Sequence, residues 1–68
     1  MNGLPLAPID RLMRRSGAER VSEDASEAMA KLITEFVDDL SSQATKLAKH
    51  AGRKTLTAED VMLAAKEF

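Results

Sequence analysis

Hydrophobic residues in the middle of the chain recur at helical spacing over an unusually long stretch. Between residues 25 and 51 they fall at i, i+3 and i+4 and share one stripe about 160° wide. Ser22 is a suitable N-cap, and Gly52 can end a helix in a left-handed conformation. The pattern predicts one long helix with this apolar stripe: Ala25, Met29, Leu32, Ile33, Phe36, Val37, Leu40, Ala44, Leu47, Ala48 and Ala51.

A short amphipathic helix is predicted before it. Pro8 suits the first turn of a helix, and Gly17 can close the last one. Ile9, Leu12 and Met13 follow the i, i+3, i+4 spacing and form one apolar face. The opposite face carries three basic residues: Arg11, Arg14 and Arg15. The simplest interpretation of that basic face is contact with water.

A second short helix is predicted at the end of the chain. Thr57 can cap it, and Asp60 lies three residues further on, as in a variant of the capping box. The residues expected on its buried side are Val61, Met62, Ala65 and Phe68.

The lengths of these helices predict that one chain cannot cover its own apolar stripe. At about 1.5 Å per residue the stripe runs roughly 39 Å, whereas the two short helices together span under about 30 Å. The middle of the stripe would therefore face water in a lone chain. We expect a single domain over residues 1–68 that pairs with a second copy crossing at the long helix. The predicted dimer core is Leu32, Ile33, Phe36, Val37 and Leu40.

Charge is distributed unevenly although the net charge is only −1. Residues 1–20 carry four arginines and two acids, and residues 46–54 carry four basic residues and no acid. Residues 22–45 between them carry six acids and one lysine. An argument for a polyanionic partner must therefore rest on the two basic segments and not on total charge.

Motifs for nucleotide binding and catalysis are weak. Residues 52–55, Gly-Arg-Lys-Thr, resemble the end of a phosphate-binding loop, but an arginine interrupts the Gly-Lys pair and the segment follows a helix. His50 is the single histidine, and the chain has no cysteine. Three acids on the long helix could hold a hard cation, but a hydrated acidic face is the simpler interpretation: Glu35, Asp38 and Asp39. We expect no enzyme activity, cofactor, metal or small-molecule substrate.

The basic segments point to a longer phosphate polymer. In a crossed dimer, residues 17–21 of one chain could lie beside residues 53–56 of the other, so that Arg20, Lys54 and Thr55 cluster near a helix N-terminus, whose amides attract phosphate. Two such clusters and the arginine faces of the first helices match a curved duplex better than a nucleotide. Both aromatic residues are expected on buried faces, where they cannot stack on single-stranded bases.

Two long segments of the sequence resemble the minimal histones of archaea. They are LPLAPIDRLMRRSGAERVSEDA and KLAKHAGRKTLTAEDVMLAAKEF, and together with the predicted helix order they extend the resemblance over essentially the whole chain. The resemblance implies an all-α histone fold of short, long and short helices that forms an obligate handshake dimer. It also implies sequence-tolerant wrapping of double-stranded DNA in a cytoplasmic nucleoid, by a homodimer or with a paralogous histone.

The resemblance also assigns roles to single residues. Arg11, Arg14, Arg20, Lys54 and Thr55 are similar to DNA-contacting residues, with Arg20 inserted into the minor groove. Three further similarities concern structure and assembly: an intrachain ion pair of Arg53 and Asp60, a contact between dimers through Leu47, His50 and Asp60, and close stacking of superhelical turns at Gly17.

Two other functions remain open at this point. The acidic centre and near-neutral charge suit a histone-fold module that works in protein assembly, and a histone could also bridge or coat DNA without wrapping it. The retained loop motifs, GAERVS and AGRKT, favour the DNA-wrapping histone. The N-terminus lacks a long apolar run or charged leader, so we expect neither a signal peptide nor a membrane span.

Overall fold

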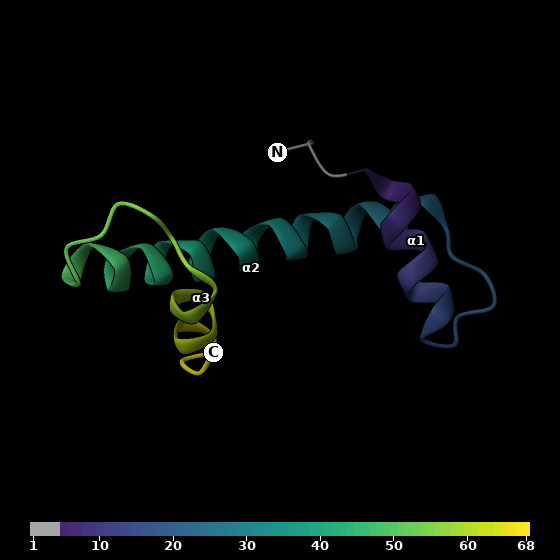
Figure 1. Ribbon diagram of the computed structural model, residues 1–68. Helices are drawn as coiled ribbons and strands as arrows, with labels where there is room; N and C mark the ends of the chain where they lie inside the picture. Colours follow the sequence, from purple (N-terminus) through teal and green to yellow (C-terminus); the bar gives the residue numbers. More distant parts are fainter. Residues whose placement is uncertain (1–4) are drawn as a thin grey trace. The chain divides into compact units, whose positions relative to one another are not determined.

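A computed structural model describes residues 5–68, which form three helices and no strand (Figure 1). These are α1 (Leu6–Arg15), α2 (Glu23–His50) and α3 (Ala58–Ala65). The predicted all-α class and the short, long, short order are confirmed. The chain divides into two compact units between Glu35 and Phe36, and α2 contributes residues to both.

Helix α1 begins at Leu6, so Pro8 lies in its first turn, where a missing N–H leaves no intrahelical bond unmade. At the other end Gly17 has a φ of +119°, a conformation that favours glycine. The Gly17 N–H donates to the Arg14 carbonyl at 3.0 Å, and the Ala18 N–H donates to the Met13 carbonyl at 3.3 Å. This is the Schellman arrangement, and it ends α1 where the sequence pattern predicts.

Both predicted ends of α2 are confirmed. The Ser22 hydroxyl oxygen accepts a hydrogen bond from the Ala25 N–H at 3.1 Å. At the C-terminus Gly52 has a φ of +75°, and its N–H donates to the Lys49 carbonyl at 2.9 Å. The Arg53 N–H donates to the Ala48 carbonyl at 2.9 Å, which completes a second Schellman arrangement.

The first unit buries very little. Of the predicted apolar face of α1, Ile9 is buried, Met13 is half-buried and Leu12 is 53% exposed. Ser26, in the first turns of α2, is also buried. This unit therefore has one buried apolar side chain among the described residues, too small a core to stabilise it alone.

The second unit packs α3 against the C-terminal half of α2 through alanines. Ala44 and Ala48 of α2 and Ala64 of α3 are all at most 3% exposed. Short side chains allow two helix backbones to approach closely, but they bury little apolar area. The Phe68 ring also packs edge-on against Phe36, with ring centroids 5.6 Å apart.

The predicted buried side of α3 is largely wrong for the single chain, since Val61 is half-buried and the other three residues are exposed. Met62 is 68% exposed and Phe68 is 56% exposed, while Asp60 and Ala64 point inward. The reason is that Asp60 turns inward to form a partly buried ion pair with Arg53, and Ala64 follows it one helical turn later on the same face. The aromatic residues Phe36 and Phe68 are likewise about half exposed and not buried.

The apolar stripe of α2 is largely uncovered. In the predicted dimer core Leu32 is 59% exposed, while Phe36 and Val37 are close to half exposed and Ile33 and Leu40 are half-buried. Helix α2 has 28 residues, whereas α1 has 10 and α3 has 8, so they are together too short to cover it. Across residues 5–68, no helix is both long and apolar enough to cross a bilayer. The exposed stripe is therefore a surface that a second chain can cover.

Replacing Leu32 with aspartate distinguishes a lone chain from a dimer. In a monomer, where Leu32 is 59% exposed, the substitution should lower the free energy of unfolding by less than about 0.5 kcal/mol. In a dimer it buries an unpaired charge in each chain, which costs about 3 kcal/mol or more and weakens dimerisation at least about 100-fold. Sedimentation equilibrium measures the difference.

The control is Ser42→Asp, which adds the same charge at an exposed position of α2 opposite the centre of the stripe. It should leave dimerisation unchanged. Equal behaviour of the two variants would contradict a dimer built on this stripe.

Candidate nucleic-acid interface

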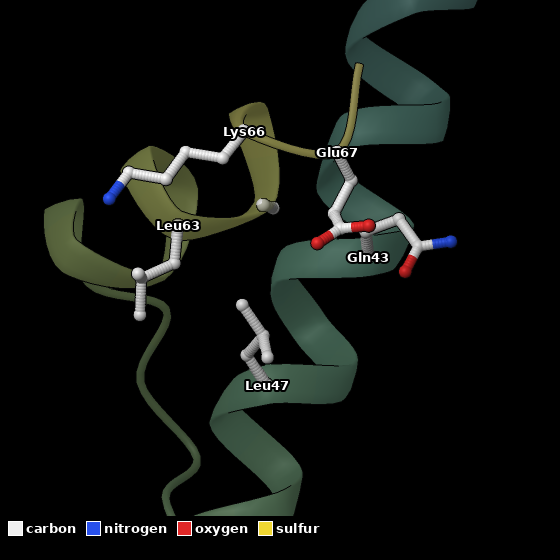
Figure 2. Close-up of a pocket in the computed structure, with 6 residues that line it drawn as sticks. Gln43, Leu47, Leu63, Lys66 and Glu67 are labelled. Carbon is white, nitrogen blue, oxygen red and sulfur yellow. The ribbon is translucent and has the colours of Figure 1, made fainter.

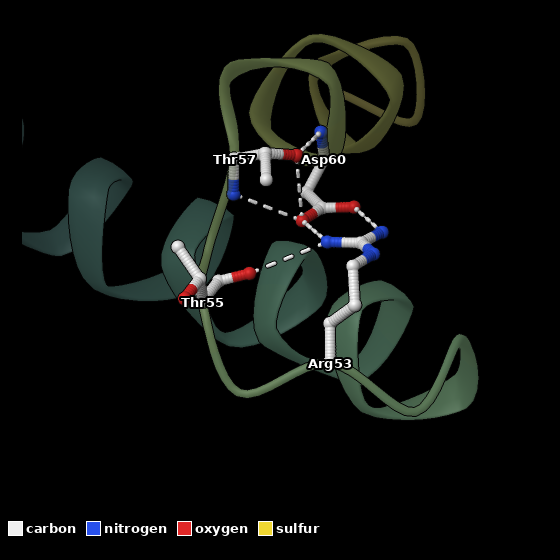
Figure 3. Close-up of polar contacts among 4 residues, drawn as sticks. All are labelled: Arg53, Thr55, Thr57 and Asp60. Atoms are coloured by element: carbon white, nitrogen blue, oxygen red, sulfur yellow. Dashed lines mark hydrogen bonds and ion pairs between the residues drawn. The ribbon is translucent and has the colours of Figure 1, made fainter.

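The second loop, residues 51–57, is closed by an ion pair (Figure 3). The Arg53 guanidinium donates from Nη1 to Asp60 Oδ2 at 2.7 Å and from Nη2 to Asp60 Oδ1 at 2.8 Å. Two parallel hydrogen bonds between a guanidinium and a carboxylate fix both position and angle. The loop is thus tied to the first turn of α3, as the resemblance implies for these two residues.

Asp60 also completes the cap of α3. Its Oδ2 accepts hydrogen bonds from the Thr57 N–H at 3.0 Å and from the Thr57 hydroxyl at 2.9 Å. The Asp60 N–H donates back to the Thr57 hydroxyl oxygen at 3.3 Å, which makes a reciprocal capping box. One carboxylate therefore holds both the loop and the helix start.

The surroundings of Asp60 and Arg53 favour the charged form of each side chain. Asp60 is only 2% exposed, and the hydrogen bonds from Arg53, followed by that from the Thr57 N–H, hold the pKa of its carboxyl well below the usual range. The same hydrogen-bonded pairing raises the pKa of Arg53. Burial without these partners would raise the pKa of a carboxyl group.

The closed loop presents its remaining polar side chains outward. Arg53 Nη1 donates to the Thr55 carbonyl at 3.3 Å, so the loop backbone is held from inside. Lys54 and the Thr55 side chain are exposed. This places an ammonium and a hydroxyl on a braced backbone, which suits a phosphate ligand.

The first loop, residues 16–22, is braced by Arg14. Its Nε donates to Asp10 Oδ2 at 3.0 Å and its Nη1 donates to the Glu19 carbonyl at 3.3 Å. Arg20 follows Glu19 directly and is exposed. Arg20 belongs to the first unit, and Lys54 and Thr55 belong to the second. Their predicted cluster combines loops from two chains, so it remains a prediction.

The arginines of α1 differ in whether their side chains already have partners within the chain. Arg11 and Arg15 are exposed and have no hydrogen bond or ion pair within residues 5–68, whereas Arg14 is engaged as described. The hydrogen bonds of Arg14 to Asp10 and to the Glu19 carbonyl were not predicted from the sequence. The i, i+4 spacing of Asp10 and Arg14 was the signal that could have indicated the first of these bonds, because residues four apart on a helix are neighbours.

The residues predicted to join dimers have mixed exposure. Leu47 is 38% exposed and lines a groove with Leu63, and Figure 2 shows these side chains pointing toward one another from α2 and α3. His50 is exposed at the end of α2, whereas Asp60 is buried. At Gly17 an added Cβ would meet nothing within 4 Å among residues 5–68. The positive φ alone explains this glycine within one chain.

The acids of α2 form no recognisable metal site. Asp38 and Asp39 are exposed, and no group of three or more acidic or histidine side chains among residues 5–68 is placed to hold a metal ion.

Comparison with known proteins identifies the family. Residues 2–65 match the family described as histone-like transcription factor (CBF/NF-Y) and archaeal histone. The chain belongs to this family. It is 58% identical to one of the subunits of the archaeal histone HAN1 from Thermococcus zilligii, over 97% of this chain and 98% of that protein. It is also 42% identical to probable archaeal histone 3 of Methanocaldococcus jannaschii, over 94% and 96% of the two chains.

A more distant relative carries the same region inside a longer protein. Histone H4 of Dictyostelium discoideum is 35% identical over 97% of this chain and 61% of its own length. The resemblance to archaeal histones is therefore confirmed, as is the histone fold. The chain is a DNA-binding, chromosome-associated histone of a dimer-forming family, and this is a structural family and not an enzyme family.

Neutralising Asp60 tests the ion pair in this histone. Because the folded-state pKa of Asp60 lies below its unfolded value of 3.8, the pair stabilises the folded state above pH 3.8. That stabilisation is lost as the pH falls from 3.8 toward the folded-state pKa. Asp60→Asn should therefore lower the Tm most near neutral pH, and the gap from wild type should narrow in acid.

Glu59→Gln is the matched control, since Glu59 is an exposed acid in the same first turn of α3. It should change the Tm much less than Asp60→Asn, as measured by circular dichroism at several pH values. A pH-independent gap for Asp60→Asn would contradict the ionic origin of the effect.

Proposed function

We propose that two copies of this chain form an obligate handshake homodimer that wraps and compacts duplex DNA with little sequence preference. The observation that carries this proposal is the uncovered apolar stripe of α2 in a chain whose two loops carry exposed basic residues. In a dimer that covers the stripe, the first loop of one chain lies beside the second loop of the other.

The dimer core in this proposal is the middle of α2. Leu32, Phe36 and Val37 are each about half exposed in the single chain, and burying the exposed half of a side chain of this size gains about 1 kcal/mol. The half-buried Ile33 and Leu40 complete the same surface. Crossing at this point gives an interface in which each chain uses the same residues, as two-fold symmetry requires.

The DNA contacts in this proposal follow the phosphate backbone. Arg20 enters the minor groove, while Lys54 and Thr55 contact phosphates beside it and the exposed arginines of α1 extend the track. The N-terminus of α2 adds free amides that attract phosphate. Inserted arginines of this kind respond to groove width and deformability, so binding depends little on base sequence.

Dimers in this proposal join into longer assemblies through the ends of α2 and α3. Leu47 and the exposed His50 make the contact, and Asp60 holds the loop beside them. Gly17 lies in open space at the end of α1, which suits close approach of a neighbouring superhelical turn. The groove between Leu47 and Leu63 supports this assignment, since it places these two leucines and Ala64 beside the polar Gln43, Lys66 and Glu67.

A second candidate function rests on the acidic residues of α2. Asp38 and Asp39 are exposed and would repel a nearby phosphate backbone. This favours a histone-fold dimer that works mainly in protein assembly, or one that bridges or coats DNA without wrapping it. The two braced basic loops support wrapping over these alternatives.

The cellular setting follows from the same proposal. We expect the chromosome that this histone binds to lie in the cytoplasm. The relative from Thermococcus zilligii bears the name of one subunit of a histone, so a paralogous chain is a second partner to test beside the homodimer.

Removing the two loop cations tests the DNA surface. Arg20→Ala with Lys54→Ala removes four cations per dimer, so the slope of log affinity against log salt should fall by about 3 to 4. Gel shifts with unrelated duplexes at several salt concentrations measure this slope and the affinity.

The control for charge alone is Lys31→Ala with Lys66→Ala, which removes the same number of cations from exposed positions outside the two loops. It should leave the slope close to that of wild type. Equal effects of the two double variants would contradict a loop-based surface, and no effect of the loop variant would favour protein assembly.

Replacing Leu47 with glutamate tests multimerisation. Nuclease footprints of the wild type should lengthen in steps as protein is added, because dimers join along the DNA. A buried glutamate at the contact should hold the Leu47→Glu footprint at one dimer's length. Ser42→Glu, on the opposite side of α2, should keep the stepwise ladder. A wild-type footprint confined to one dimer would refute this part of the proposal.

A further inference from the structure

Arg14 makes two hydrogen bonds that span the end of α1. Its Nε bonds to the Asp10 carboxylate one turn earlier, and its Nη1 bonds to the Glu19 carbonyl beyond the Gly17 turn. All of these residues belong to the first unit. The side chain therefore connects the helix to the loop backbone directly before Arg20.

The backbone of residues 19–21 makes one hydrogen bond to the described part of the chain, residues 5–68. That bond is the one from Arg14 to the Glu19 carbonyl. The backbone up to Ala18 is held by the helix-ending bonds to Met13 and Arg14, and regular bonding resumes when the Ser22 carbonyl accepts from the Ser26 N–H. Between these points the loop relies on Arg14. Without it, the peptide that leads into Arg20 has no polar restraint in this part of the chain.

We propose that Arg14 is a positioning residue that presents Arg20 to the minor groove, and that Asp10 orients Arg14 for this task. This inference rests on the proposed function, in which Arg20 inserts into DNA. It separates Arg14 from Arg11 and Arg15, whose side chains have no such partners within the described residues.

The chemistry of the two bonds requires a guanidinium. Its donors lie in a rigid planar fork, so Nε can hold the carboxylate while Nη1 reaches the carbonyl. A lysine carries the same charge, but its single ammonium cannot hold both acceptors in the same geometry. The adjacent Asp10 carboxylate also offsets part of the Arg14 charge, which makes Arg14 a weaker attractor of phosphate than Arg15.

The test uses charge-conserving variants of the full chain. Arg14→Lys and the matched control Arg15→Lys are each made in the wild-type and Arg20→Ala backgrounds, and duplex affinity is measured by fluorescence anisotropy. Loss of one net hydrogen bond in each of two loops should make Arg14→Lys bind about tenfold more weakly than Arg15→Lys. Arg15→Lys keeps a cation on the DNA track and breaks no bond to the loop, so it measures the exchange of guanidinium for ammonium alone. On Arg20→Ala the Arg14→Lys effect should disappear, as expected when one residue acts through the other.

A second measurement needs no DNA. In the free Arg14→Lys dimer the ¹⁵N order parameter of the Arg20 amide should fall, while it should stay at the wild-type value in Arg15→Lys. The proposal is overturned if the two lysine variants bind DNA alike, if the Arg14→Lys effect persists on Arg20→Ala, or if the Arg20 amide is unchanged. Wild-type affinity of Arg20→Ala itself would instead overturn the inserted-arginine function on which the proposal rests.

Discussion

The structure depends on an apolar stripe that its own chain cannot cover. Helix α2 carries that stripe over 28 residues, while the buried apolar side chains among residues 5–68 are one isoleucine and three alanines. So small a core cannot offset the entropy lost on ordering the chain. We therefore expect folding and association of this histone to be one process, in which the second chain covers the stripe.

The two loops are braced from inside in the same way. In the second loop Arg53 holds Asp60 and the Thr55 carbonyl, and in the first loop Arg14 holds Asp10 and the Glu19 carbonyl. In each case an arginine bonds to one carboxylate and to one backbone carbonyl of the loop. The exposed cations, Arg20 and Lys54, are then carried on backbone that is already ordered. Order before binding reduces the entropy that binding must overcome.

A near-neutral net charge does not conflict with a DNA-binding role, because the charges are sorted by position. Several of the acids are in caps and ion pairs, and others lie in the middle of α2. Arg11, Arg15, Arg20 and Lys54 have no partner in the described chain and lie on α1 or the loops, while the other cations without partners lie on α2 or at the end of α3: Lys31, Lys46, Lys49 and Lys66. Electrostatic attraction to phosphate acts mainly within a Debye length of about 8 to 10 Å, so local sorting decides it.

The order of residues along the chain was enough to predict the helix order, both ends of α2, the end of α1 and the start of α3, because caps and Schellman turns use residues within five positions of each other. The start of α1 at Leu6 and the end of α3 at Ala65 were not predicted. The order of residues also indicated the need for a partner, since helix length follows from residue count. The face that α3 buries and the hydrogen bond from Arg14 to the Glu19 carbonyl became known only from the packed chain. Both depend on groups that loops bring together: Arg53 draws Asp60 inward in place of Met62 and Phe68, and the Gly17 turn returns the Glu19 carbonyl to Arg14. Helical periodicity indicates which residues share a face, but it does not indicate which polar group of a loop lies against that face.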